Sequence, residues 1–308
     1  MFKYSLDNKR YHTLNYYYKN KYGKKTFKVS LNANFSCPNK EKTGSGCIYC
    51  SRLGSGDFAG NKDDDLVTQF NKVKEVMEQK WPDSYYIGYF QANTNTYAPL
   101  SELKEKYESI LNLPNVVGLN IATRSDAISK ECYDYLEELS KRTNLTMEIG
   151  LQSMHEKTLK LINRGHDLKN FENCIKELKK RNITTVVHII NGLPGESKED
   201  MIETVKYLNK LHIDGLKIHM LYITKDTDLE DYYQTNPFHI LTKDEFIDIV
   251  ISELEYLSPE VVIHRITSGP KWSDLIEPTW LLKKFGIQND IDKEMVKRNT
   301  YQGKKIKE

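Results

Sequence analysis

Short runs of β-branched and aromatic residues alternate along the chain with longer amphipathic segments, and this pattern limits the possible fold more than any other feature. The amphipathic segments carry helix-capping signals, among them Ser197 followed by Asp200 and Thr242 followed by Glu245. Strands joined through helices pair in parallel with right-handed crossovers, so the sequence predicts an α/β fold around a parallel sheet. We expect strands at 26–35, 85–91, 116–123, 146–152, 184–191 and 216–223, and helices at 65–80, 101–112, 129–142, 168–182, 198–211 and 243–257.

Composition excludes several classes of protein. Charged residues make up 29% of the 308 residues, and no apolar run reaches the roughly 18–20 residues that a membrane crossing needs. The N-terminal sequence has no apolar region typical of a secretory signal. Five cysteines are an odd number, and a chain of this size does not depend on disulfides for stability. We therefore expect a cytoplasmic protein without membrane spans, in which clustered thiols hold metal.

The first 28 residues are strongly basic and rich in tyrosine. Eight lysine and arginine residues face a single acid, Asp7, and six tyrosines are interleaved with them. Lysines neutralise phosphates, and tyrosine rings offer faces on which unstacked bases can lie, so the segment suggests nucleic-acid contact; the alternative is a solvated arm that aids solubility. The candidate RNA-binding residues are Lys9, Arg10, Lys19, Lys21, Lys24 and Lys25.

Polar and glycine-bearing loops follow the expected strands repeatedly. In parallel α/β folds the carboxyl ends of the strands meet at one edge, where ligands bind. Turn chemistry alone explains any single loop, but five such loops favour a shared site. The loops are the cysteine cluster after the first strand and residues 91–96, 124–126, 150–153 and 191–196 after the others, with Thr123 ending the third strand.

Three cysteines, Cys37, Cys47 and Cys50, lie within 14 residues, and the turn between Gly44 and Gly46 allows the loop to fold back on itself. Structural zinc requires four ligands, and no fourth cysteine or histidine lies nearby. A redox Cys-x-x-Cys pair leaves Cys37 without a role. An iron–sulfur cluster held by three thiolates leaves one iron open for a small ligand, and the missing fourth ligand favours this interpretation. Cys132 and Cys174 lie in helical patterns and are expected to be buried and inert.

The chain resembles the YhcC/YtqA-like radical S-adenosylmethionine (SAM) family, relatives of the radical SAM domain of the elongator catalytic subunit. The matching stretches are CPNKEKTGSGCIYC, YFQANTNTYAP, NIATRSD, EIGLQSMHEKTLKLINRGH, HIINGLPGE, KIHMLYITKDTDL and HRITSGPKWSDLIEPTW. Nine residues separate the first two cysteines, instead of the three usual in the superfamily. The resemblance implies a partial (β/α)6 TIM-like barrel at 26–240, preceded by the basic arm at 1–25 and followed by a substrate-facing extension at 241–308.

The resemblance also implies roles for individual residues. Cys37, Cys47 and Cys50 would bind three irons of a [4Fe–4S] cluster, whose fourth iron would bind SAM. The other cofactor contacts it implies are Tyr49 beside the adenine, Gln91 and Asn93 near the methionine amino group, Gln152 and Arg164 toward the ribose and carboxylate, His188 where several relatives carry a carboxylate, the loop Gly192, Leu193 and Pro194 beside the adenine, and Thr123. From the residues alone, His188, His219 and His264 fall in apolar strand patterns that more often hold a hydrogen-bonded core histidine than a ligand.

The implied function is a radical SAM enzyme that modifies tRNA, converting the 5-carboxymethylaminomethyl side chain of a wobble uridine to aminomethyl. The partners would be tRNA and a reductant such as flavodoxin or ferredoxin. Two alternatives stay open. One is a different radical reaction on RNA, although sulfur insertion is disfavoured because only three cysteines cluster. The other is a non-catalytic nucleic-acid-binding protein with a structural metal.

Overall fold

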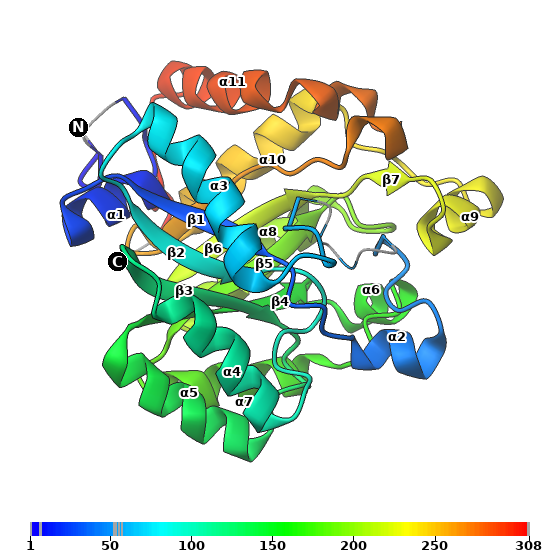
Figure 1. Ribbon diagram of the computed structural model, residues 1–308. Coiled ribbons are helices and arrows are strands. Elements are labelled where there is room, and N and C mark those ends of the chain that lie inside the picture. The colour runs from blue at the N-terminus through cyan, green and yellow to red at the C-terminus, as the bar shows by residue number, and fades with distance from the viewer. Residues whose placement is uncertain (1, 6–7, 52–53, 55, 57, 307–308) are drawn as a thin grey trace.

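The computed structural model describes residues 2–5, 8–51, 54, 56 and 58–306 (Figure 1). Within them, seven parallel strands lie side by side in a single curled sheet in the order β1-β2-β3-β4-β5-β6-β8. A separate antiparallel pair joins β7 to β9. The strands are β1 Thr26–Leu31, β2 Tyr85–Phe90, β3 Val116–Thr123, β4 Asn144–Gln152, β5 Thr184–Asn191, β6 Gly215–Met220, β7 Ile223–Thr224, β8 Val262–Arg265 and β9 Leu275–Glu277.

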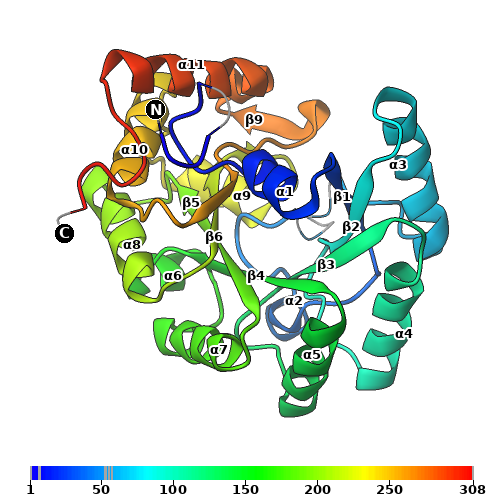
Figure 2. The same ribbon diagram turned by 90° about the vertical axis from the view of Figure 1, so that its left-hand side faces the viewer.

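Helices cover the outer face of the sheet, and the predicted partial TIM-like barrel is confirmed (Figure 2). Both predicted capping boxes are present, at the start of α8 and of α10. The helices are α1 Leu14–Tyr22, α2 Pro38–Thr43, α3 Leu66–Lys80, α4 Leu100–Leu111, α5 Lys130–Arg142, α6 Glu156–Leu161, α7 Leu168–Lys180, α8 Lys198–Lys210, α9 Asp228–Thr235, α10 Lys243–Tyr256 and α11 Lys284–Lys297.

The sheet has one strand more than the six we expected. β8 lies in the segment predicted as a C-terminal extension, where it pairs in parallel with β6. The sequence shows an apolar strand pattern around His264, but a strand of only four residues is not among those that we expected in the sheet. β1 is shorter than predicted because the side-chain amide of Gln69 bonds to both backbone groups of Asn32, at 2.8 and 3.0 Å, directly after the strand ends.

Side chains alternate between the two faces of the sheet, as the pleat requires. Outward residues such as Val29, Leu119 and Ile218 are completely buried against the helices and form the hydrophobic core. The inward positions carry polar groups instead. Lys28, Tyr89, Asn120, Glu148, His188 and Lys217 take these positions on β1 to β6. The interior of the barrel is therefore polar, and the apolar core lies outside it.

The N-terminal segment packs against the barrel. α1 contacts both edge strands, β1 and β8, and Thr13 forms a parallel bridge to Ile263. Tyr11 and Tyr18 are buried. Figures 1 and 2 show α1 at the end of the barrel opposite α2, beside the amino ends of the strands. No helix in the described part of the chain combines the length and apolar character that a membrane crossing requires.

Candidate cofactor and substrate site

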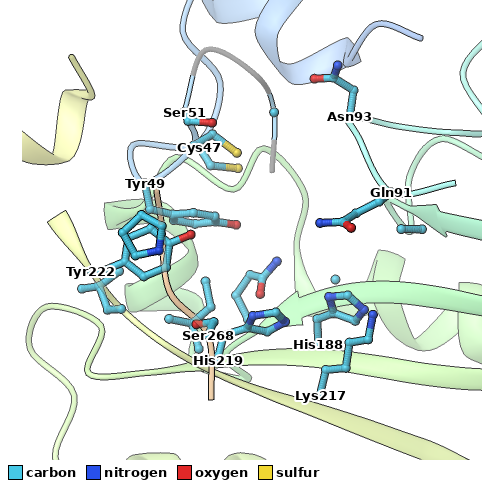
Figure 3. Close-up of a pocket in the computed structure, with 18 of the residues that line it drawn as sticks. Cys47, Tyr49, Ser51, Gln91, Asn93, His188, Lys217, His219, Tyr222 and Ser268 are labelled. Atoms are coloured by element: carbon cyan, nitrogen blue, oxygen red, sulfur yellow. The ribbon is translucent and has the colours of Figure 1, made fainter. Parts of the chain in front are cut away.

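The cysteine loop follows β1 at the carboxyl ends of the strands. Gly44 and Gly46 have φ values of 84° and 89°, the left-handed conformation that the predicted turn needs. The loop is tied to the α6–α7 connection, because the side-chain amide of Asn163 donates to the carbonyl of Gly46 at 2.5 Å. The backbone N–H of Ile48 also donates to the carbonyl of Ile162, at 3.1 Å. These bonds place the Cys47 and Cys50 thiols on the wall of one cavity (Figure 3).

Donors and positive charge surround the thiol of Cys47. Arg164 Nη1 lies 3.8 Å from the Cys47 sulfur, and the Asn39 amide nitrogen lies 3.6 Å from it. A hydrogen bond with Cys50, together with the charges of Arg164 and Arg124, holds the pKa of Cys47 well below its usual range. This environment favours the thiolate, which is the form that binds metal.

The three clustered thiols line one cavity together with cationic side chains. Buried Arg164 Nε and Arg124 Nη1 also have no hydrogen-bond partner among the described residues, so donors remain for an anionic group. The donor set suits a [4Fe–4S] cluster with SAM beside it.

The same cavity collects most of the residues implied by the sequence. Gln152 has a φ of 76° at a bulge where β4 ends, a backbone conformation that is uncommon for residues other than glycine. A Cβ at the neighbouring Gly150 would lie 2.8 Å from Gln152 Nε2 and 2.9 Å from Arg164 Nη2, so a larger residue there would displace the ends of these two side chains. The predicted residues that line the cavity are Cys37, Cys47, Tyr49, Cys50, Gln91, Asn93, Thr123, Gln152, Arg164 and His188.

The glycine loop and the basic residues lie elsewhere. Gly192, Leu193 and Pro194 follow β5, where Leu193 is buried in a separate apolar cluster, and the described cavity lining does not include them. The basic segment lies at the opposite end of the barrel. There Lys9 pairs with Asp292. Of the other candidates, Arg10 bonds to Asn299, Lys21 to Tyr17, Lys24 to Asp83 and Lys25 to Asn15, while Lys19 lies in the last turn of α1.

A charged network forms the floor of the cavity, inside the barrel. The completely buried Glu148 carboxylate accepts from Lys28 at 2.8 Å, Asn120 at 2.6 Å and His188 at 2.9 Å, and it also pairs with Lys217. Burial, reinforced by the charges of Lys28 and Arg265, lowers the pKa of Lys217 to about 7, although Glu148 opposes this shift. Figure 3 shows His188, Lys217 and His219 at the end of the cavity away from Cys47.

Sequence analysis assigned no role to Glu148 or Lys217. A signal was available, because charged residues in the middle of apolar strands are almost never buried without a partner. Of the three histidines expected to be hydrogen-bonded, His188 bonds to Glu148, and His264 lies 3.0 Å from Lys28 Nζ. His219 differs, because its buried Nε2 atom has no partner among the described residues.

We expect acid to destabilise the fold through these histidines. Burial lowers the pKa of His188 to about 4 and those of His219 and His264 well below 6.5. The unfolded chain therefore takes up protons first, so stability is present above about pH 6.5 and is lost as the pH falls. His219→Gln should reduce the proton uptake on unfolding at pH 5, measured from urea titrations at several pH values, by about one. Equal slopes for the variant and the parent protein would contradict the prediction.

The chain matches two families along its length. Residues 36–208 match the radical SAM superfamily, and residues 213–297 match the radical SAM C-terminal domain. The chain is 46% identical to protein YtqA of Bacillus subtilis over 305 residues, which are 98% of this chain and 95% of YtqA. It is 28% identical over 154 residues to Elongator complex protein 3 of Schizosaccharomyces pombe, covering 49% of this chain and 28% of that protein.

A solved structure shares the fold. The Elp3 protein of the archaeon Methanocaldococcus infernus aligns with a TM-score of 0.69 and 17% identity, over 91% of this chain and 64% of that one. The resemblance to the YhcC/YtqA-like family is thus confirmed, and with it a [4Fe–4S] cluster and SAM as the cofactors. The chain belongs to the radical SAM superfamily and, within it, to the family of YtqA.

Proposed function

We propose that the cavity between the cysteine loop and the barrel floor carries out a radical reaction on a side chain of tRNA. When bound, the cluster and SAM supply a 5′-deoxyadenosyl radical that removes a hydrogen atom from the substrate. The observation that carries the proposal is the convergence of ten predicted residues, three of them cysteines, on one cavity that extends into a polar barrel interior.

The chain's own residues bind the cluster, orient SAM and shield the radical from water. Cys37, Cys47 and Cys50 would hold three irons, and Arg164 would pair with the carboxylate of SAM through its fork of donors. Gln152 offers both a donor and an acceptor for the ribose hydroxyls. Tyr49 would border the adenine. The barrel wall keeps a reactive radical away from bulk water, which limits side reactions.

For the substrate, we propose the 5-carboxymethylaminomethyl group of a wobble uridine, which the enzyme would leave as aminomethyl. The two electrons would pass from this side chain to SAM, giving methionine and 5′-deoxyadenosine, and water would release the two carboxymethyl carbons as glyoxylate. The sequence likeness to Elongator complex protein 3 supports a place in the same branch of the superfamily. The basic N-terminal segment faces the other end of the barrel, so any RNA contact there would be remote from the reacting uridine. The reductant would be a flavodoxin or a ferredoxin.

Anaerobic reconstitution tests the radical chemistry. Protein treated with iron and sulfide should turn brown, bind about four irons and, with reduced flavodoxin, release 5′-deoxyadenosine from SAM. A colourless protein that carries only zinc after this treatment would overturn the enzyme proposal.

Nucleoside analysis tests the substrate. Digested tRNA from a strain lacking the gene should accumulate 5-carboxymethylaminomethyluridine and lose the aminomethyl product, as measured by mass spectrometry. Unchanged wobble-uridine profiles would remove the tRNA proposal and leave the radical chemistry standing.

A further inference from the structure

The floor of the cavity carries more positive than negative charge. Lys28, Lys217 and Arg265 contribute three cations, and Glu148 is the carboxylate bonded to the two lysines. All four acceptor contacts of Glu148 are already in use, by Lys28, Asn120, His188 and Lys217. The carboxylate thus has no capacity left to neutralise a further cation.

Arg265 is the cation of this group that does not pair with Glu148. It ends β8, opposite Lys217 in the register of β6, and it lines the same cavity. Within the described part of the chain it makes no ion pair or hydrogen bond, whereas its charge acts on Lys217, His188 and His219. An arginine fork beside a polar cavity is suited to a planar anion.

A second polar atom lies at the same place. The buried Nε2 atom of His219 has no partner among the described residues, and its ring lies 5.1 Å from that of His188, tilted by 30°. In the tautomer that carries its proton on Nε2, His219 can donate to an anion. A buried polar atom without a partner is costly unless a ligand or water bonds to it. Lys217 Nζ, which donates to Tyr89 at 2.9 Å and pairs with Glu148, retains one further donor toward the cavity.

We propose that Arg265, His219 and Lys217 form a subsite for a carboxylate group of the substrate, at the end of the cavity away from the cysteines. The inference rests on the proposed function and specifies how the substrate is held. Because Glu148 already pairs with both lysines, Arg265 is the cation there without a carboxylate partner, and the neighbouring Glu148 carboxylate disfavours a dianion such as phosphate. The carboxymethyl end of the proposed uridine side chain carries the planar, singly charged carboxylate that suits this arginine.

Equilibrium binding of two nucleosides to the reconstituted holoenzyme with SAM tests the subsite. The probes are 5-carboxymethylaminomethyluridine and its methyl ester, which has nearly the same shape but lacks the negative charge. We expect the acid to bind at least about tenfold more tightly than the ester. Arg265→Gln should remove this preference and leave ester binding unchanged, while Arg142→Gln, at the amino end of the barrel, should keep it.

Several results would overturn the subsite. They are equal binding of acid and ester, no binding of either, a preference that survives Arg265→Gln, and displacement of the acid by inorganic phosphate at lower concentration than by acetate. These results are distinct from failure of the proposed function. An unchanged tRNA profile in the deletion strain, combined with an acid preference that depends on Arg265, would keep the carboxylate subsite and change the substrate.

Discussion

Replacing Cys47 with serine is expected to leave the reconstituted protein with little cluster iron and to lower SAM cleavage by more than about 100-fold. Of the three clustered cysteines, Cys47 is the buried one, with 6% of its surface exposed, and Arg164 and Asn39 favour its thiolate. A serine hydroxyl is not deprotonated there and is a poor ligand for iron. Iron content, the visible absorbance of the cluster and release of 5′-deoxyadenosine together measure the effect.

Cys132→Ala is the matched control. Cys132 is also a buried thiol, with 1% exposure, but it lies on α5 in the apolar core, where burial raises its pKa to about 12. This variant should bind the same amount of iron as the parent protein and cleave SAM at a similar rate. If the Cys47 variant retained a full cluster, or if both variants lost iron equally, the assignment of the ligands would be wrong.

Glu148→Gln is expected to lower the free energy of unfolding by about 3 kcal/mol at pH 7. The variant would leave the ammonium groups of Lys28 and Lys217 without their carboxylate, inside a barrel where these side chains are 14% and 5% exposed. Their charges hold the pKa of Glu148 well below 4.5 despite its burial, so its stabilising contribution is present above that pH and is lost as the pH falls further. Urea unfolding of the iron-free protein under anaerobic conditions measures the change.

The control for this variant is Glu138→Gln. Glu138 pairs with Arg142 one turn along α5, at 3.8 Å, where the two side chains are 62% and 44% exposed, and such pairs contribute less than about 0.5 kcal/mol. Similar losses for both variants would show that the buried network is no more important than a surface ion pair. A larger loss for Glu148→Gln at pH 4 than at pH 7 would contradict the stated direction of its pKa.

The fold could be predicted from the sequence largely because its repeating pattern is local. Each β–α unit has its own hydrophobic periodicity and helix cap within a short stretch of sequence. Ser197 and Thr242, the N-caps of α8 and α10, are examples. β8 was missed for the opposite reason. Its four residues become a strand because β6 offers a free edge, and that edge exists only once the first six strands have assembled. The same dependence explains why the tyrosine-rich segment was interpreted as a free arm, although Tyr11 and Tyr18 are buried.

The rim of the site was predictable and its floor was not. The close spacing of Cys37, Cys47 and Cys50 identifies them as candidate ligands. Residues such as Gln152 are recognisable because they lie at the ends of predicted strands. The floor is assembled from single inward positions of separate strands, about 30 to 60 residues apart in the chain, so no motif connects Glu148 to Lys217 or Arg265. Only the parallel register brings these residues level with one another.

The contact of the N-terminal segment with both edge strands has a practical consequence for anyone shortening the chain. The N-terminal segment covers both edge strands of the sheet. Thr13 forms a bridge to Ile263 in β8, and α1 packs on β1 and β8. Removal of residues 1–25 would uncover these edges, which recruit other chains and promote aggregation. Insolubility of such a truncation would therefore indicate that the edges of β1 and β8 are exposed. A purification tag is better placed at the C-terminus.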